Sequence, residues 1–206
     1  MASNHPSPPQ SDPKRIYLLA YNAISALLWF RILLAVLTAP SPTTVYTPLE
    51  PWTRWTQTLA VADILHAAVG ITRAPIFTTF TQVFARSVQV WAINYGFPGV
   101  TASSRAYAAM LFAWSIADVV RYSYFVVLLA GSPVPSFLRW LRYSLFAVLY
   151  PIGIGSEWWL MFRAASVTDR SSVAGIFYFC LGLYAPGAVM MYSYMIKQRR
   201  KTLARS

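Results

Sequence analysis

Charged residues are scarce in this chain of 206 residues: Asp, Glu, Lys and Arg together make up 11% of it. A soluble domain typically carries about 25%, because charged side chains coat a surface that faces water. Hydrophobic residues reach 57%, which exceeds the roughly 45–50% of ordinary soluble domains, glycine included. The composition therefore argues against a soluble globular enzyme and indicates a membrane protein.

Residues that bind metals or act as nucleophiles are also few. The single cysteine, Cys180, closes no internal disulfide and forms no CxxC metal site. Only two histidines are present, His5 and His66, so the histidine boxes of membrane di-iron enzymes are missing. The chain also lacks HExxH, GxSxG and a glycine-rich dinucleotide fingerprint. We therefore expect no bound metal, no redox cofactor and no hydrolysis by a nucleophilic side chain.

Acidic residues are outnumbered, since 6 Asp and Glu stand against 17 Lys and Arg and give a net charge of +11. The basic residues are scattered between apolar runs and cluster only at the C-terminus, which is not the pattern of a nucleic-acid footprint. We interpret them as the charge bias that orients a membrane protein, and we expect no nucleic-acid partner. The 8 Trp, 13 Tyr and 12 Phe exclude a disordered chain.

Six apolar stretches approach the roughly 17–25 residues that cross a bilayer as a helix. The second is short for a span and contains Asp63 and His66. Proline, glycine and small polar residues separate the stretches, as expected of short loops between helices. The sequence thus predicts an all-α membrane protein with a bundle of six transmembrane helices over residues 16–38, 57–71, 76–97, 106–130, 137–162 and 173–196.

The tails differ from this membrane domain, which we place at residues 16–196. Residues 1–15 contain four prolines and almost no apolar side chains, so we expect a disordered tail. Residues 197–206 form a basic tail that can also attract anionic lipid headgroups. With six spans, most Lys and Arg of the short loops and tails fall on the side that holds both termini, which predicts that both termini are cytosolic.

Ionisable residues inside the expected spans are informative, because a charge that faces lipid is costly and normally points into the bundle. Asp118 and Arg121 are three residues apart and can pair on one helix, and Asp63 and His66 have the same spacing. Each pair has two readings that the sequence leaves open, a functional one and an internal ion pair that fixes helix packing.

Tyr150 and Glu157 form the most suggestive acid/base pair. Seven residues at about 100° each bring both side chains to one helix face, about 10 Å apart. Pro151 is expected to kink that helix, while Gly153 and Gly155 allow a substrate or another helix to approach. Tyr150 also has a purely structural reading, as one aromatic packing residue among 13 tyrosines.

The run that contains this pair, LRYSLFAVLYPIGIGSE, resembles the signature of the 3-hydroxyacyl-CoA dehydratases of the endoplasmic reticulum, the protein-tyrosine-phosphatase-like membrane proteins of fatty acid elongation. Further segments agree in the same order: YNAISALLW, ILHAAVGITRAP, TTFTQVFARSVQVWAI and AWSIADVVRYSYF. The resemblance covers the chain from about Tyr17 to the last expected helix.

The resemblance implies site residues. The family's catalytic tyrosine and glutamate correspond to Tyr150 and Glu157. The supporting polar residues of its third and fourth helices correspond to Gln82, Arg86, Arg121 and Tyr122. The sequence departs from the family pattern at Asp63 and Asp118, where glutamates are expected. We therefore leave both aspartates out of the catalytic set.

The reaction that the resemblance implies is removal of water from a very-long-chain (3R)-3-hydroxyacyl-CoA to give the trans-2-enoyl-CoA, the third step of the elongation cycle. It needs no redox cofactor. We expect Glu157 to handle the α-proton and Tyr150 the leaving oxygen, with the reverse assignment open. Gln82 and Arg86 would orient this pair or polarise the thioester. Arg139 and Arg142 would meet the CoA phosphates.

The resemblance also implies residence in the endoplasmic reticulum membrane and, as partners, the condensing enzyme and the ketoacyl and enoyl reductases of elongation. Two other classes of protein are alternatives to an enzyme. A non-catalytic scaffold of the elongation machinery would be favoured if the Tyr/Glu pair were absent, and a small transporter by duplicated halves, which the sequence does not show. A phosphatase is disfavoured because no Arg-bearing phosphate loop follows Cys180.

Overall fold

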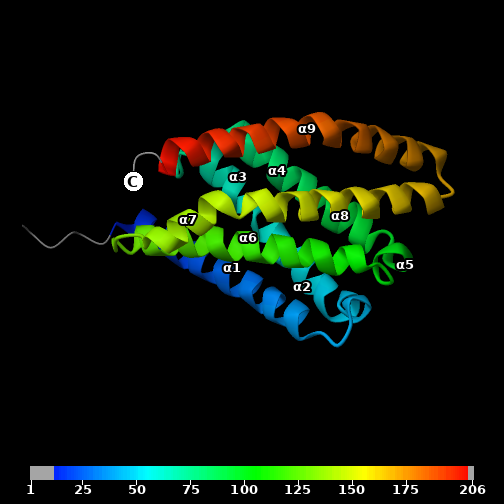
Figure 1. Cartoon of the computed structure of the whole chain (residues 1–206), viewed down its shortest axis with the longest axis horizontal. Coiled ribbons are helices and arrows are strands. Elements are labelled where there is room, and N and C mark those ends of the chain that lie inside the picture. The colour runs from blue at the N-terminus through cyan, green and yellow to red at the C-terminus, as the bar shows by residue number, and fades with distance from the viewer. Residues whose placement is uncertain (1–11, 204–206) are drawn as a thin grey trace, which may run out of the picture.

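The computed structural model describes residues 12–203, and its regular structure within that range is entirely helical (Figure 1). Residues 1–11 of the expected N-terminal tail and residues 204–206 of the expected C-terminal tail lie outside the described residues, whereas residues 197–203 belong to the last helix. The elements are α1 (Pro13–Thr38), η1 (Pro42–Thr44), α2 (Tyr46–Leu59), α3 (Val61–Ala68), α4 (Ile76–Val88), η2 (Gln89–Tyr95), α5 (Pro98–Thr101), α6 (Arg105–Leu129), α7 (Ser136–Ser144), α8 (Phe146–Val167) and α9 (Ser171–Leu203).

Four helical stretches of the described chain are long and apolar enough to cross a membrane: Pro13–Thr38, Arg105–Leu129, Ser136–Val167, which joins α7 and α8, and Ser171–Thr202. This number is smaller than the six spans expected from the sequence. The structure thus supports an all-helical membrane protein. Large apolar side chains such as Leu27, Val69 and Phe179 are 68% exposed, as expected of surfaces that face lipid.

The two remaining apolar stretches are helical but interrupted. The expectation of one helix over residues 57–71 is wrong, because α2 ends at Leu59 and α3 begins at Val61. The amide of Ala60 bonds the carbonyl of Gln57, three residues back, which tightens the turn between the two helices. The next stretch changes from an α-helix to a π-helix at Gln89, a rare geometry that often occurs near functional sites.

The ends of α1 and α8 also differ from the expected ones. Asp12 caps α1 by accepting a hydrogen bond from the Lys14 amide, so the helix begins at Pro13, inside the expected tail. The expected stretch over residues 137–162 is divided at Leu145 into α7 and α8, and α8 continues through Pro151. This division lies six residues before Pro151, beyond the Ala147 carbonyl that the proline leaves without its usual donor.

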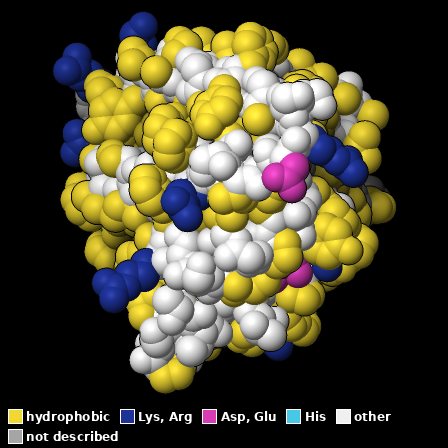
Figure 2. Space-filling view, turned by 90° about the vertical axis from the view of Figure 1, so that its right-hand side faces the viewer, with side chains coloured by type: hydrophobic (Ala, Val, Ile, Leu, Met, Phe, Trp, Pro, Cys, Tyr) yellow, Lys and Arg dark blue, Asp and Glu magenta, His cyan; other side chains and the backbone are white. Residues whose placement is uncertain are grey.

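The long helices lie side by side, with α6 between α1 and α8 and with α9 packed on α7 and α8 (Figure 1). The start of α1 and the end of α9 lie at one end of the bundle, and α5 lies at the other (Figure 1). Figure 2 looks onto the α5 end, where hydrophobic side chains are interspersed with a few charged ones.

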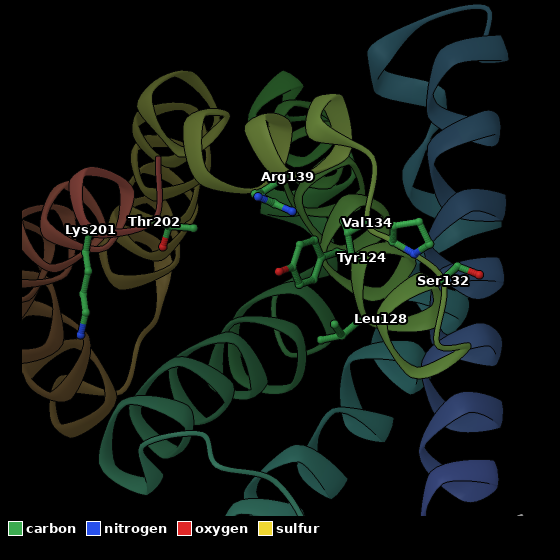
Figure 3. Close-up of a pocket in the computed structure, with 8 residues that line it drawn as sticks. Tyr124, Leu128, Ser132, Val134, Arg139, Lys201 and Thr202 are labelled. Atoms are coloured by element: carbon green, nitrogen blue, oxygen red, sulfur yellow. The ribbon is translucent and has the colours of Figure 1, made fainter. Parts of the chain in front are cut away.

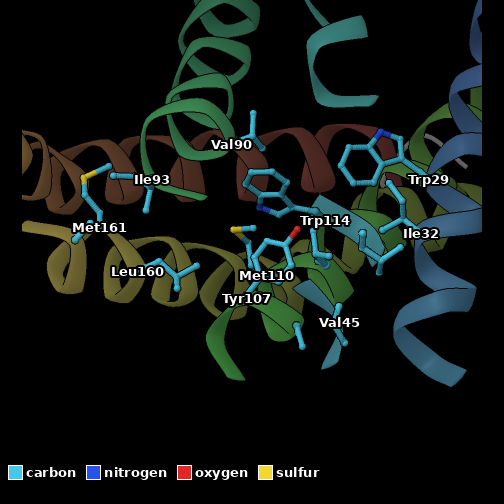
Figure 4. Packing of buried hydrophobic residues seen from close by; sticks show 14 of the residues in the cluster. Trp29, Ile32, Val45, Val90, Ile93, Tyr107, Met110, Trp114, Leu160 and Met161 are labelled. Atoms are coloured by element: carbon cyan, nitrogen blue, oxygen red, sulfur yellow. The ribbon is translucent and has the colours of Figure 1, made fainter. Parts of the chain in front are cut away.

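The core lies where α1, η2, α6 and α8 meet, and Figure 4 labels Trp29, Ile93, Met110, Trp114 and Leu160 among its buried side chains. These side chains are 5% exposed or less. Lipid is as apolar as this core, so burial alone does not hold the helices together. Close packing and buried polar contacts between helices must do so, and the polar contacts gather around α6.

Candidate active site

Glu157 lies on the buried face of α8 and is 5% exposed. Its Oε1 accepts a hydrogen bond from the indole Nε1 of Trp114 on α6 at 2.8 Å. Its Oε2 accepts one from the hydroxyl of Tyr184 on α9 at 3.1 Å. Three helices therefore meet at one carboxylate, and both of its oxygens have a donor.

Gly153 lies where α8 packs on α6. A Cβ atom placed on Gly153 would lie 3.7 Å from the Trp114 ring, which is ordinary contact distance, so an alanine would fit there. The indole lies against α8 at this position, one turn before Glu157. A larger residue at Gly153 would push the indole away from the carboxylate.

Tyr150 lies two turns before Glu157 on the same helix and is partly buried. Its ring lies 6.0 Å from the ring of Tyr192 on α9, measured between centroids. The hydrogen bonds of Glu157 run to Trp114 and Tyr184, so the expected pair is not joined directly. Tyr150 contacts α9 at Tyr192, and Glu157 contacts it at Tyr184, eight residues earlier on that helix.

Arg86 approaches the site from α4 through Trp114. Its guanidinium carbon lies 4.0 Å from the centre of the Trp114 ring, the same ring whose Nε1 donates to Glu157. Its Nη2 lies 2.7 Å from Oδ2 of Asp118, which follows Trp114 by one turn of α6. Arg86 therefore holds the indole that holds the carboxylate, a positioning role.

Arg121 and Tyr122 belong to an ion network that extends from this point toward α3. Arg121 contacts both aspartates at 3.2 Å, Asp118 through Nε and Asp63 through Nη1. The hydroxyl of Tyr122 donates to Oδ2 of Asp63 at 3.3 Å. His66 lies 4.0 Å from the same carboxylate. The two aspartates left out of the expected catalytic set thus link α3, α4 and α6. This agrees with the interpretation of the Asp118/Arg121 and Asp63/His66 pairs as internal contacts that fix helix packing.

The other expected supporting residues lie apart from Glu157. Gln82 is exposed on α4, one turn before Arg86. Arg142 packs against aromatic rings, with its guanidinium carbon 4.8 Å from the Tyr124 ring centre and 4.6 Å from that of Phe125. Neither side chain contacts the carboxylate.

Arg139 lines a pocket of about 470 Å³ at the end of the bundle where α1 begins and α9 ends. The pocket is formed by the ends of α6 and α9, the loop after α6, and α7. Figure 3 shows Arg139 and Tyr124 on one side and Lys201 on the other. The sequence placed Lys201 in a basic tail, and only the structure brings it opposite Arg139.

These features define a class of protein: a helical membrane protein with a buried carboxylate and facing phenols, suited to proton transfer in an apolar site. A family model described as protein tyrosine phosphatase-like protein, PTPLA, matches residues 57–205. The chain belongs to this family, which confirms the resemblance seen in the sequence.

Three relatives show how far the similarity extends. The chain is 37% identical to a probable very-long-chain (3R)-3-hydroxyacyl-CoA dehydratase of Schizosaccharomyces pombe, with 92% of this chain and 94% of the relative covered. It is 35% identical to the dehydratase PASTICCINO 2 of Arabidopsis thaliana, with 94% and 95% covered. It is 30% identical to dehydratase 2 of Homo sapiens, with 91% and 81% covered. No solved structure matches the chain.

Arg86 offers a test of this arrangement. Arg86→Ala leaves the Asp118 carboxylate, which is 4% exposed, without its closest cation. We expect a loss of about 2 kcal/mol in stability, below the value for a fully buried pair because the Arg86 side chain is 22% exposed. Thermal unfolding in detergent measures it, with Arg73→Ala as a control at an exposed loop arginine. A parental unfolding temperature for Arg86→Ala would show that the ion pair does not hold α4 on α6.

Proposed function

We propose that this chain is a very-long-chain (3R)-3-hydroxyacyl-CoA dehydratase, a hydro-lyase that forms the trans-2-enoyl-CoA. The observation that carries the proposal is Glu157, a buried carboxylate with two donors, in a chain related over nearly its full length to proteins of that name. Elimination of water is redox-neutral, so it needs no electron carrier. It does need one group to take the α-proton and one to protonate the departing hydroxyl.

We assign the base to Glu157 and the acid to Tyr150. The indole Nε1–H of Trp114 can only donate, so Oε1 of Glu157 is an acceptor in this site. A carboxylate that accepts at both oxygens is the form that can take a proton from C2. Tyr150 then gives its hydroxyl proton to the oxygen on C3, the C3–O bond breaks and water leaves. Proton transfer from Glu157 to the Tyr150 phenolate restores both groups.

The remaining polar residues act around this pair in our proposal. Trp114 and Tyr184 fix the two oxygens of Glu157, and Arg86 fixes Trp114. Gln82 lies on the same face of α4 as Arg86, one turn away, where it can contact the thioester. Arg121 and Tyr122 anchor α6 to α3 through Asp63.

The pocket at Arg139 and Lys201 suits the nucleotide end of CoA. Two cations from different helices attract the phosphates, and Tyr124 offers an aromatic face beside them. Tyr150 follows Arg139 by eleven residues, about 16 Å along the helices. An extended pantetheine arm can cover that distance and bring the thioester to the reacting pair.

We further propose six spans with both termini in the cytosol, in the endoplasmic reticulum membrane. Two interrupted helical segments, α2 with α3 and α4 with η2, would cross in addition to the four long helices. Acyl-CoA is cytosolic, and the proposed CoA pocket lies at the end of the bundle where α1 begins and α9 ends. As partners we propose the enzymes before and after it in elongation: the condensing enzyme, a 3-ketoacyl reductase that supplies the substrate and an enoyl reductase that consumes the product.

This topology makes a prediction. Glycosylation acceptor sites inserted in the loops at the α5 end, near residues 40 and 169, should be modified in microsomes. Sites in the C-terminal tail, or in the loop between α6 and α7, should stay unmodified. Gel mobility before and after glycosidase treatment gives the answer. Modification of the C-terminal tail would overturn the orientation.

The proposed activity is tested with purified protein in detergent. Long-chain (3R)-3-hydroxyacyl-CoA should yield the trans-2-enoyl-CoA without added metal or nicotinamide, as followed by liquid chromatography and mass spectrometry. The (3S) isomer is the control and should react far more slowly. Folded protein that binds the (3R) substrate but leaves it unchanged would favour the non-catalytic scaffold instead.

A further inference from the structure

A groove of about 230 Å³ runs between α8 and α9 beside the candidate active site. Its walls are almost entirely apolar, and the only side chains with a polar atom among its lining residues are Trp158 and Tyr184. The lining residues are Ile154, Gly155 and Trp158 of α8 and Tyr184, Ala185 and Ala188 of α9.

The groove is continuous with the reacting groups through Tyr184. This residue forms part of the wall, and its hydroxyl donates to Oε2 of Glu157 at 3.1 Å. Along α8 the groove begins one turn beyond Tyr150 and extends to the level of Glu157. Along α9 it lies between Tyr192, which packs on Tyr150, and Tyr184. The groove thus starts at the proposed reaction centre, on the side away from the pocket at Arg139 and Lys201.

Small residues keep the groove open. A Cβ atom placed on Gly155 would meet nothing within 4 Å, whereas one on Gly153 would touch Trp114 at 3.7 Å. Gly153 therefore serves the packing of α8 on α6, and Gly155 leaves space on the opposite side. Ala185 and Ala188 face this space from α9.

We propose that this groove holds the acyl chain of the 3-hydroxyacyl-CoA, and this inference rests on the proposed function. In the proposed function the CoA phosphates lie in the pocket at Arg139 and Lys201, and C2 and C3 of the substrate lie beside Glu157 and Tyr150. The acyl chain must then leave the reaction centre along an apolar path. The groove is such a path, and it begins at the reaction centre. Its outer side is open, so the distal part of a very long chain can continue into the bilayer. No end wall then limits the chain length.

The test fills the groove from the wall where the structure leaves room. Gly155→Leu adds a side chain into the groove, and Gly182→Leu is the matched control, because Gly182 also has open space at its Cβ position but does not line the groove. The readout is kcat/KM for (3R)-3-hydroxystearoyl-CoA divided by that for (3R)-3-hydroxybutyryl-CoA, whose short chain does not reach the groove.

We expect Gly155→Leu to lower this ratio roughly tenfold or more, because overfilled space excludes the long chain. Gly182→Leu should leave it unchanged. An unchanged ratio in Gly155→Leu, or an equal loss for both substrates, would overturn the proposal. A change only in the lipid dependence of activity would assign the groove to a bilayer lipid and would also overturn it.

Two further measurements cover failures of the first variant or of the assay. If Gly155→Leu does not fold, Ala188→Leu takes its place. It fills the groove from α9 and should lower the same ratio. A stearoyl-CoA analogue with a diazirine near the middle of its chain should crosslink to peptides that contain residues 154–158 or 184–188. Crosslinks confined to other helices would refute the groove. Folded parental protein that turns over no 3-hydroxyacyl-CoA would refute the proposed function, and the crosslinks would then decide on the groove alone.

Discussion

Replacing Glu157 by Gln is expected to slow dehydration by at least about a hundredfold, because a general base typically contributes about 10²- to 10⁴-fold. The amide keeps the size of the side chain, and its oxygen can still accept from Trp114 at the position of Oε1. The helices should therefore stay packed, while the group can no longer take the proton from C2. Initial rates with long-chain (3R)-3-hydroxyacyl-CoA measure the loss.

The matched control is Glu50→Gln. Glu50 is another buried glutamate, 7% exposed, but it lies on α2 and pairs with Arg54 at 2.9 Å. The Glu50→Gln variant should retain parental turnover. This result would show that activity depends on Glu157 in particular and not on any buried carboxylate. Size-exclusion profiles and unfolding temperatures must show that both variants are folded. Near-parental turnover by folded Glu157→Gln would remove this carboxylate from the mechanism and would direct attention to Asp118.

Replacing Tyr150 by Phe is expected to cost at least two orders of magnitude as well, since it removes only the hydroxyl that protonates the leaving group. Substrate affinity should stay close to parental, because the ring and its packing against Tyr192 remain. The double variant with Glu157→Gln should lose far less than the product of the two single losses, since groups that act as a unit are not additive.

Tyr192→Phe is the control for this second prediction. It removes a hydroxyl from the ring that faces Tyr150, on α9 rather than α8. If Tyr192→Phe loses as much activity as Tyr150→Phe, the proton donor is not uniquely Tyr150. If the double variant loses the full product of the single effects, the two residues act independently and the paired mechanism fails.

The sequence predicted the helical segments well because each is an apolar run bounded by proline, glycine or polar residues. It did not predict the breaks. Neither the turn at Ala60 nor the π-helix at Gln89 contains proline or glycine, and both lie beside contacts that are distant in sequence. Asp63 contacts Arg121, 58 residues away, and the Asn94 carbonyl accepts from the Tyr46 hydroxyl, 48 residues away. The division between α7 and α8 at Leu145 lies six residues before Pro151, so the proline does not mark it either.

For the site, the family motif supplied Tyr150 and Glu157, and the pattern on α8 placed them on one face. The partners of Glu157 were not predictable, because Trp114 and Tyr184 lie 43 and 27 residues away in sequence and only helix packing brings them together. A usable signal was present for Trp114, which precedes Asp118 by one helical turn and therefore shares its buried face. Nothing in the sequence indicated that Lys201 lies in one pocket with Arg139.

Exchange of the proton at C2 tests the central claim most directly. The reaction is run to partial conversion in D₂O, and the remaining 3-hydroxyacyl-CoA is recovered and analysed for deuterium at C2. We predict that the parental protein introduces deuterium there by reversal of the elimination, and that folded Glu157→Gln introduces it at least about a hundredfold more slowly. Deuterium incorporation by Glu157→Gln at the parental rate would contradict the account, because another group would then move this proton.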